Sequence, residues 1–237
     1  FPYTTLFRSQ QRDRAGSAAG PRDRIGPPHR TLAVEPDRRR NHHIALAAAC
    51  IAGDAHQTTG IVIVLPIPSL AGLTTERLRF RPLSLTDADW WMGYLNDAEA
   101  IRFMPFTVGS RNDCMTMIQR SLDRYAADGS GLHVVSLKES SVPIGQCGLL
   151  TQVVDGIDEL EIGYHLLPQH WGHGFATEAA VACKRFAYEH RLAASVISLI
   201  DAGNLRSQLV ARRNGMLPEK RSEHRGVEAI VFRASLL

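Results

Sequence analysis

Cysteine is scarce in this sequence and follows no pattern typical of a disulfide framework or a metal site. The 237 residues include four cysteines, Cys50, Cys114, Cys147 and Cys183, and no two of them form a C-x-x-C pair. Disulfide-rich secreted domains and zinc sites depend on closely paired spacing of that kind. The composition therefore predicts a protein of the reducing cytoplasm that binds no metal.

The sequence also lacks an apolar run long enough to cross a membrane. Its two apolar runs, residues 44–53 and 61–73, both fall short of the roughly 18 to 20 residues that a spanning helix needs. We therefore predict no membrane segment.

Lysine is absent from the first forty residues, which hold nine arginines against four acidic residues. The remainder carries slightly more acidic than basic residues, so no basic surface for nucleic acid is expected. The N-terminal segment is rich in Arg, Gly, Pro and Ala without a sustained period, so it cannot bury enough apolar surface to offset its ordering entropy. We predict that residues 1–70 are disordered or a non-native extension, that residues 1–68 can be deleted without loss of stability, and that the folded domain spans residues 73–237.

From residue 73 onward, strand and helix patterns follow one another along the chain. Alternating or apolar runs predict strands at residues 77–81, 133–138, 144–152, 159–167, 195–201 and 227–236. Helices are expected after a cap at Thr86, after Ser110 with Asp113, and at residues 205–214, which end at Gly215. Residues 155–158 are expected to form a polar loop.

The most informative stretch is a glycine turn, residues 169–178, between a predicted strand and a predicted helix. Gly172 and Gly174 let the backbone approach a ligand without a Cβ atom in the way. The free N–H groups and the positive dipole of the following helix start favour an anion such as phosphate. An ordinary tight connection would have the same two glycines, so the turn needs its surroundings to be informative.

Three spaced stretches together resemble the GNAT family of acyl-CoA-dependent N-acetyltransferases, within the branch of the ribosomal-protein N-terminal alanine acetyltransferases. Residues 73–82 (LTTERLRFRP) are similar to the first strand of that branch. Residues 161–164 (EIGY) followed by 171–179 (WGHGFATEA) are similar to its central motif. Residues 204–207 (NLRS) and 214–216 (NGM) resemble its third motif. The resemblance spans residues 73–237, with the stretches in the family order.

The resemblance implies an α/β (α+β) fold, with a mixed, mostly antiparallel central sheet that is flanked by helices. Its fourth and fifth strands, here residues 159–167 and 195–201, would splay apart and hold the pantetheine of acetyl-CoA in the gap. The glycine turn would hold the pyrophosphate. The implied cofactor-binding residues are Leu166, Leu167, Gln169, Gly172, His173, Gly174, Phe175, Ala176, Thr177, Asn204 and Ser207.

Acetyl transfer to an amine calls for a base, because at pH 7 only roughly a tenth to a sixth of an α-amine is neutral. The resemblance implies that Glu161 is this base, with a solvated strand residue or a structural ion pair as the alternative. Ser207 would donate a proton to the departing thiolate, or would instead cap its helix or hold the pantetheine. Ala211 stands where many relatives have a tyrosine donor. His165 is the second candidate for the base or for a substrate contact.

The predicted activity is direct transfer of acetyl from acetyl-CoA to a primary amine, on a protein N-terminus or on a small molecule. The alternative is a non-catalytic module of the same fold that senses acyl-CoA, which the missing tyrosine favours. A monomer or a homodimer is expected. The acceptor would be chosen by the two N-terminal helices and by the loops at residues 103–107 and 155–158. Of Trp90 and Trp91, at most one is expected to face it, because neighbouring residues of a helix point to different faces.

Overall fold

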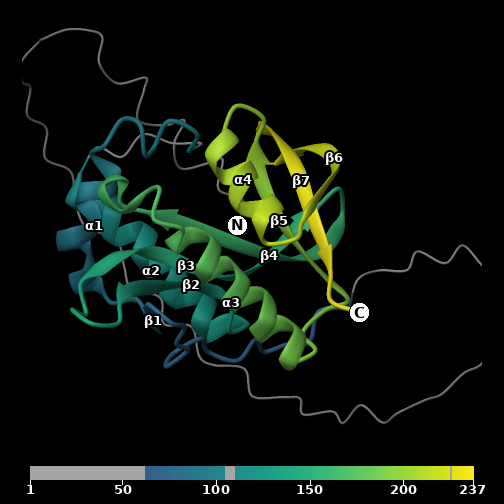
Figure 1. The fold of residues 1–237 in the computed structure, drawn as a ribbon, viewed down its shortest axis with the longest axis horizontal. Coiled ribbons are helices and arrows are strands. Elements are labelled where there is room, and N and C mark those ends of the chain that lie inside the picture. The colour runs from purple at the N-terminus through teal and green to yellow at the C-terminus, as the bar shows by residue number, and fades with distance from the viewer. Residues whose placement is uncertain (1–61, 105–109, 225) are drawn as a thin grey trace, which may run out of the picture. The chain divides into compact units, whose positions relative to one another are not determined.

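The chain forms seven strands and four α-helices in the part that the structure describes, residues 62–104, 110–224 and 226–237 of this computed structural model (Figure 1). The strands are β1 (Leu78–Arg81), β2 (Gly131–Leu137), β3 (Pro143–Val154), β4 (Ile157–Leu166), β5 (Ser195–Asp201), β6 (Leu217–His224) and β7 (Val227–Ser235). The α-helices are α1 (Ala88–Leu95), α2 (Arg111–Ala127), α3 (Phe175–Glu189) and α4 (Leu205–Arg213), with short 3-10 turns at η1 (Leu85–Asp87) and η2 (Pro168–His170).

All seven strands belong to one sheet, in the order β1-β2-β3-β4-β5-β7-β6. Neighbouring strands pair antiparallel, except for β4 and β5, which run parallel. A parallel pair needs a crossover connection, and here α3 supplies it between β4 and β5. The mixed, mostly antiparallel sheet that the resemblance implies is therefore confirmed.

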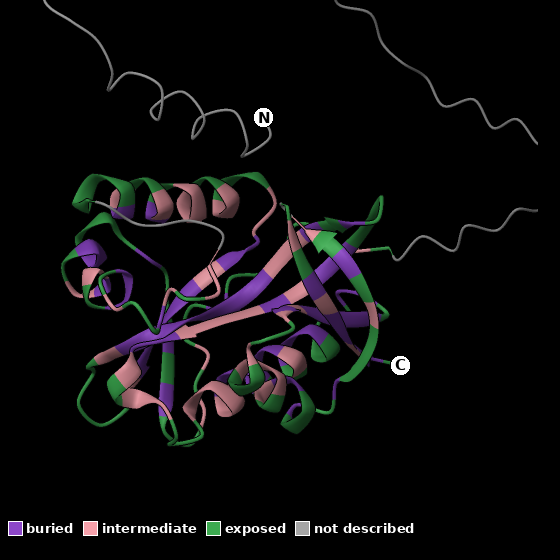
Figure 2. Cartoon of the chain, turned by 90° about the horizontal axis from the view of Figure 1, so that it is seen from above, coloured by how far each residue is buried: buried purple, intermediate pink, exposed green. Residues whose placement is uncertain are grey.

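Helices cover both faces of the sheet. Helices α1 and α2 pack on one face, over a core that includes Trp91, Ile118 and Val134. Helix α3 packs on the other face, over a larger core that includes Leu149 and Ile162. Figure 2 shows the buried residues along the sheet and the exposed outer sides of the helices on either side of it. No helix in the described part of the chain is long and apolar enough to span a membrane.

The connection between β3 and β4 is tighter than the polar loop predicted at residues 155–158. Val154 pairs with Ile157, so the turn consists of Asp155 and Gly156 alone. Both of these residues have positive φ, 52° and 80°. Two central residues with positive φ are typical of the type I′ turn that closes a twisted hairpin. The predicted loop is therefore wrong, and β4 begins two residues before its predicted start at Glu159.

Strand β6 is absent from the sequence prediction. Its sequence, LPEKRSEH, alternates neither in polarity nor in size, and most of the strand is exposed. The strand lies at the edge of the sheet, where charged residues and a proline are tolerated because one side has no partner strand. Pairing with β7, from Leu217↔Arg233 to His224↔Val227, holds it in place.

The folded part of the chain begins before Leu73. Ile67 and Leu70 are 3% and 1% exposed and belong to the core beneath α3. The backbone N–H groups of Val64 and Ile67 donate to Leu192 O at 2.7 Å and Asp128 O at 2.8 Å. The predicted boundary near residue 70 is therefore moved back to residue 62 at least, because an irregular apolar segment can be buried without strand or helix periodicity. The rest of the predicted extension, residues 1–61, lies outside the described residues.

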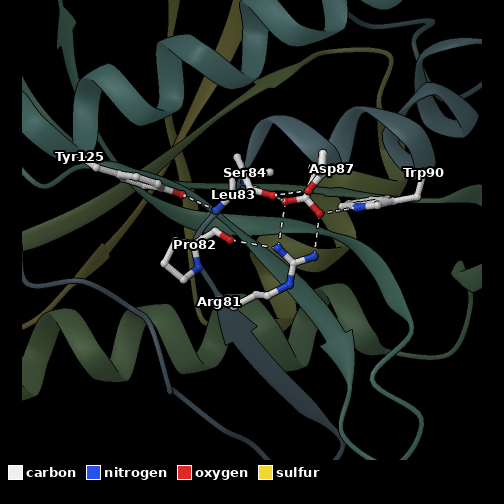
Figure 3. Close-up of polar contacts among 8 residues, drawn as sticks. Arg81, Pro82, Leu83, Ser84, Asp87, Trp90 and Tyr125 are labelled. Atoms are coloured by element: carbon white, nitrogen blue, oxygen red, sulfur yellow. Dashed lines mark hydrogen bonds and ion pairs between the residues drawn. The ribbon is translucent and has the colours of Figure 1, made fainter.

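A buried carboxylate joins the end of β1 to the start of α1 (Figure 3). Asp87 is 3% exposed and accepts from Arg81 Nη1 and Nη2 at 2.9 and 2.6 Å, from Trp90 Nε1 at 2.7 Å and from Ser84 N at 2.8 Å. These donors outweigh the cost of burial and lower the pKa of Asp87 to about 2. The helical turn is capped at Ser84 rather than at the predicted Thr86. At α2, by contrast, Ser110 accepts from Asp113 N, as predicted.

Candidate active site

The sheet is nearly interrupted between β4 and β5. A single Cα pair, Glu161↔Ile197, joins the two strands. After this pair, β4 continues to Leu166 and β5 to Asp201 without pairing, so a gap opens toward their C-terminal ends. The splay between the fourth and fifth strands is therefore present, at the place the resemblance implies.

Side chains take over the backbone bonds at the vertex of this gap. Ser198 Oγ donates to Ile162 O at 2.8 Å. The carboxylate of Glu161 accepts from Leu199 N at 3.4 Å with one oxygen and from Gln152 Nε2 at 2.7 Å with the other. Glu161 therefore lies at the vertex with its carboxylate oriented by two donors. These contacts give it a structural role, and its role as a base stays a prediction.

Ion pairs hold the strands together on the other side of the single pair. Arg233 of β7 donates from Nη1 and Nη2 to the two carboxylate oxygens of Glu159 of β4 at 2.9 and 2.6 Å. The same guanidinium reaches Ser195 Oγ of β5 at 2.7 Å and Glu219 at 2.8 Å. The side chain of Glu159 is 3% exposed, and its hydrogen bond and charge raise the pKa of Arg233 despite partial burial. This contact closes the N-terminal end of the seam.

The register of the hairpin determines which backbone groups of β4 face the gap. Leu167 N donates to Ile144 O of β3 at 2.9 Å, and Leu167 O accepts from His170 N at 2.9 Å. Both backbone groups of Leu167 therefore already have partners within the protein, and its predicted pairing with pantetheine stays a prediction. The backbone N–H and C=O groups of successive residues point to alternate sides of a strand. The backbone groups of Tyr164 and Leu166 therefore point toward the gap instead. Leu166 O already accepts from Trp171 Nε1 at 2.7 Å, so, as far as the described residues show, Leu166 N–H and the backbone of Tyr164 are left for a ligand.

The glycine turn has the geometry predicted for an anion site. Gly172 and Gly174 have φ values of 80° and 81°, and Gly174 is the N-cap of α3. No side chain of the described residues makes a capping hydrogen bond to this helix. Within the described part of the chain, nothing accepts a hydrogen bond from the backbone N–H groups of residues 172–177. Residues 172–174 and Gln169 are exposed, and Phe175, Ala176 and Thr177 are half-buried. An uncapped helix start in the open is suited to a phosphate.

The first turn of α4 lies beside β4. Tyr164 Oη donates to Ser207 O at 2.8 Å, and burial raises the pKa of Tyr164. Asn204 caps this helix, because its Oδ1 accepts from Ser207 N at 3.1 Å. The half-buried Ser207 hydroxyl has no hydrogen-bond partner among the described residues. The structure therefore assigns the cap to Asn204 rather than to Ser207. Ala211 is fully buried, and its methyl side chain has no hydroxyl that could act as a donor.

His165 projects from β4 toward α1, on the opposite face from α3. Its Nδ1 lies 3.3 Å from Tyr94 Oη, which donates its single proton to Ala100 O at 3.0 Å. Nδ1 therefore carries the imidazole proton in this contact, and the lone pair is left on Nε2. Burial lowers the pKa of His165 to about 4, so the ring is neutral at pH 7.

The two tryptophans of α1 have different surroundings. Trp91 is 3% exposed and stacks on Tyr94 with ring centroids 4.4 Å apart, so it is a core residue. Trp90 is half-buried and bonded to Asp87. The acceptor loop predicted at residues 103–107 lies partly outside the described residues. No group of three or more His, Cys, Asp or Glu side chains that could hold a metal ion occurs among the described residues.

Comparison with known proteins defines the class to which this fold and glycine turn belong. The family model described as "Acetyltransferase (GNAT) domain" matches residues 77–217, more than half of the chain. The chain therefore belongs to the GNAT acetyltransferase family. It is 32% identical over 147 residues to "Uncharacterized protein YkkB" of Bacillus subtilis (strain 168), a match that covers 61% of this chain and 84% of that protein.

Solved structures give the same result for the fold. An acetyltransferase from Agrobacterium tumefaciens str. C58 superposes with a TM-score of 0.60 and 26% identity, over 70% of this chain and 95% of that chain. The ribosomal L7/L12 alpha-N-protein acetyltransferase RimL, in complex with coenzyme A, superposes with a TM-score of 0.57 and 15% identity, over 73% and 98% of the two chains. The second likeness supports the fold alone.

Proposed function

We propose that this protein transfers acetyl from acetyl-CoA to a primary amine, on a protein N-terminus or on a small molecule. The uncapped start of α3 beside the β4–β5 gap is the observation that carries this proposal. The N–H groups of residues 172–177 would hold the diphosphate, and Leu166 N–H with the backbone of Tyr164 would pair with the pantetheine. Acetyl-CoA supplies the activated thioester, whose carbonyl carbon the amine attacks.

Two residues of β4 are candidates for the base that accepts the amine proton. Glu161 lies at the vertex of the gap, and His165 lies four residues further, which is about 13 Å along a strand. At this spacing, the two side chains cannot both accept a proton from an amine at one position. A neutral imidazole with a pKa of about 4 has little affinity for a proton at pH 7. An ordinary glutamate carboxylate is a base of similar strength, so position separates the two: we assign the base to Glu161, at the vertex of the gap, and a contact with the acceptor to His165.

Ser207 is the candidate for proton donation to the departing thiolate. Its hydroxyl is half-buried in the first turn of α4, and its carbonyl is tied to Tyr164 on the strand beside the gap. The cap of α4 is made by Asn204, which leaves the Ser207 hydroxyl to the ligand. A serine here would replace the tyrosine donor that Ala211 cannot provide.

The alternative is a module that binds acyl-CoA without turning it over. The buried Ala211, with no hydroxyl at the position of the usual donor, favours it. Release of CoA thiol separates the two functions. The protein is incubated with acetyl-CoA and with short peptides, polyamines, amino acids or aminoglycosides, and free thiol is measured over time. Amine-dependent release supports the transferase, whereas acetyl-CoA binding without thiol release for any amine supports the module.

A further inference from the structure

One carboxylate in the first turn of α3 is bound to the start of the sheet. Glu178 Oε1 accepts from Thr75 Oγ1 at 2.5 Å and from Arg77 N at 2.9 Å. Glu178 Oε2 accepts from Arg77 Nε at 2.7 Å and lies 2.6 Å from Arg77 Nη2. Desolvation opposes these donors, but their sum lowers the pKa of Glu178. Residues a hundred positions apart in the sequence therefore meet beside the glycine turn.

The same arginine also contacts the turn itself. Arg77 Nη1 donates to His173 O at 3.1 Å, and the guanidinium carbon lies 4.5 Å from the centre of the Phe175 ring. A Cβ atom on Gly174 would lie 3.6 Å from Arg77 Nη2. One guanidinium thus spans the turn from His173 to Phe175 and reaches Glu178 one helical turn further.

This placement has an electrostatic consequence for an anion at the turn. A carboxylate in the first turn of a helix is favourable for the helix, but it repels a second anion at the same helix start. Arg77 neutralises Glu178 through a contact in which two guanidinium nitrogens meet one carboxylate oxygen, Oε2. With the carboxylate compensated, the free N–H groups of residues 172–177 present a net positive site.

We infer that Arg77 is a positioning residue for the phosphates of CoA: it holds the glycine turn by His173 O and cancels the charge of Glu178. The inference rests on the proposed function, because it assumes that the turn receives the diphosphate. It leads to a specific expectation: loss of Arg77 weakens ligands that carry phosphates, and leaves the phosphate-free part of the same ligand unaffected.

The test compares equilibrium binding of acetyl-CoA and of S-acetyl-pantetheine, which lacks every phosphate. For Arg77→Met we expect acetyl-CoA affinity to fall about tenfold or more, and S-acetyl-pantetheine affinity to change by less than about twofold. Adding Glu178→Gln to that variant should recover at least about threefold of the lost affinity, because the uncompensated charge is gone. Arg79→Met, at an exposed arginine of β1 two residues further along the chain, is the control and should behave as the parent.

Arg77→Lys provides the same test if the methionine variant does not fold. Lysine keeps the charge beside Glu178 but cannot reach His173 O at the same time, so we expect about a threefold loss for acetyl-CoA alone. An equal loss for both ligands, or no recovery with Glu178→Gln, would overturn the inference and leave a merely structural tie. A parent protein without preference for acetyl-CoA over S-acetyl-pantetheine would overturn the proposed function, and the inference with it.

Discussion

At the N-terminal end of the β4–β5 seam, Arg233 bonds both oxygens of Glu159 and joins β4, β5 and β7. At the C-terminal end, beyond Glu161↔Ile197, the same two strands separate, and side chains satisfy part of the exposed backbone. The first end is held by the ion pair of Arg233 with the buried Glu159, and the second leaves Leu166 N–H and the backbone of Tyr164 for a ligand. The ion pair of Arg233 with Glu159, which we call the clamp, holds the strands together at one end. The strands can therefore separate at the other end while the sheet stays intact.

The largest effect is expected at the vertex between the two ends. Glu161→Gln keeps the shape and an oxygen for Leu199 N, but it removes the proton acceptor. We expect the turnover number to fall by a factor on the order of 10² to 10⁴, with acetyl-CoA affinity unchanged. The deficit should shrink toward high pH, where the amine arrives neutral. Thiol release across pH 6 to 9 measures this.

Ser207→Ala is the companion variant for the glutamate and should cost less, because solvent can protonate the thiolate. Parent-like turnover of Glu161→Gln over the whole pH range would remove Glu161 as the base and leave it a structural residue. In that case His165→Gln becomes the variant that decides.

The closed end is expected to depend on its ion pair for stability. Arg233→Met would leave the carboxylate of Glu159, whose side chain is 3% exposed, buried without a partner. Removing one partner of a buried pair costs about 3 kcal/mol of unfolding free energy. Urea unfolding measures the change. Arg221→Met is the matched control in the same hairpin, since Arg221 and Glu228 are 67% and 61% exposed and their pair should contribute well under about 1 kcal/mol. Equal losses in the two variants would contradict a special role for the clamp.

Asp87 is a second buried carboxylate, outside the β4–β5 seam. Its contribution to stability can be compared with that of the Arg233–Glu159 pair. Its pKa, lowered to about 2 from 3.8, implies that Asp87→Asn costs about 2 kcal/mol at pH 7. Because the folded pKa is depressed, this stability is present above pH 4 and is lost as the pH falls from about 4 to about 2. The parent and variant should therefore converge in urea unfolding near pH 2. Asp89→Asn, at a 72% exposed carboxylate in the first turn of α1, should change stability little at any pH. A parent–variant gap that stays constant down to pH 2 would count against the assigned cause.

The smallest of the four effects concerns the open end. Gly174→Val would place a branched side chain at φ 81°, where the backbone is expected to meet the phosphates. We expect acetyl-CoA affinity to fall more than tenfold, which is above about 1.4 kcal/mol. Gly156→Val is the control, because Gly156 has φ 80° and a Cβ atom there would meet nothing within 4 Å, but it lies in the β3–β4 turn. It should lose stability without losing affinity in calorimetric titration. Unchanged affinity in a folded Gly174→Val protein would refute the phosphate site.

Much of the fold could be predicted because its signals are local. The apolar runs of β4 and β5, the Ser110 cap with Asp113 and the glycine turn each depend on residues that are close in the sequence. The failures have physical causes as well. Strand β6 is an edge strand without an apolar face, and the burial of Ile67 and Leu70 comes from an irregular segment. Neither leaves a periodic pattern.

By itself, the sequence determined the order and type of most elements and the position of the glycine turn. The periodicity of apolar residues and the glycines that permit positive φ are both visible in short stretches of sequence. Only the tertiary structure decided which hydrogen bonds and ion pairs the residues of the candidate site make. In the folded protein, both backbone groups of Leu167 have partners, and the Trp171 indole donates to Leu166 O. The carboxylate of Glu161 is oriented by Gln152 and Leu199. Arg77 forms an ion pair with Glu178. These contacts depend on the register of the strands and on pairings between segments that are distant in the sequence. Such pairings form only when the chain folds, so they leave no local pattern in the sequence.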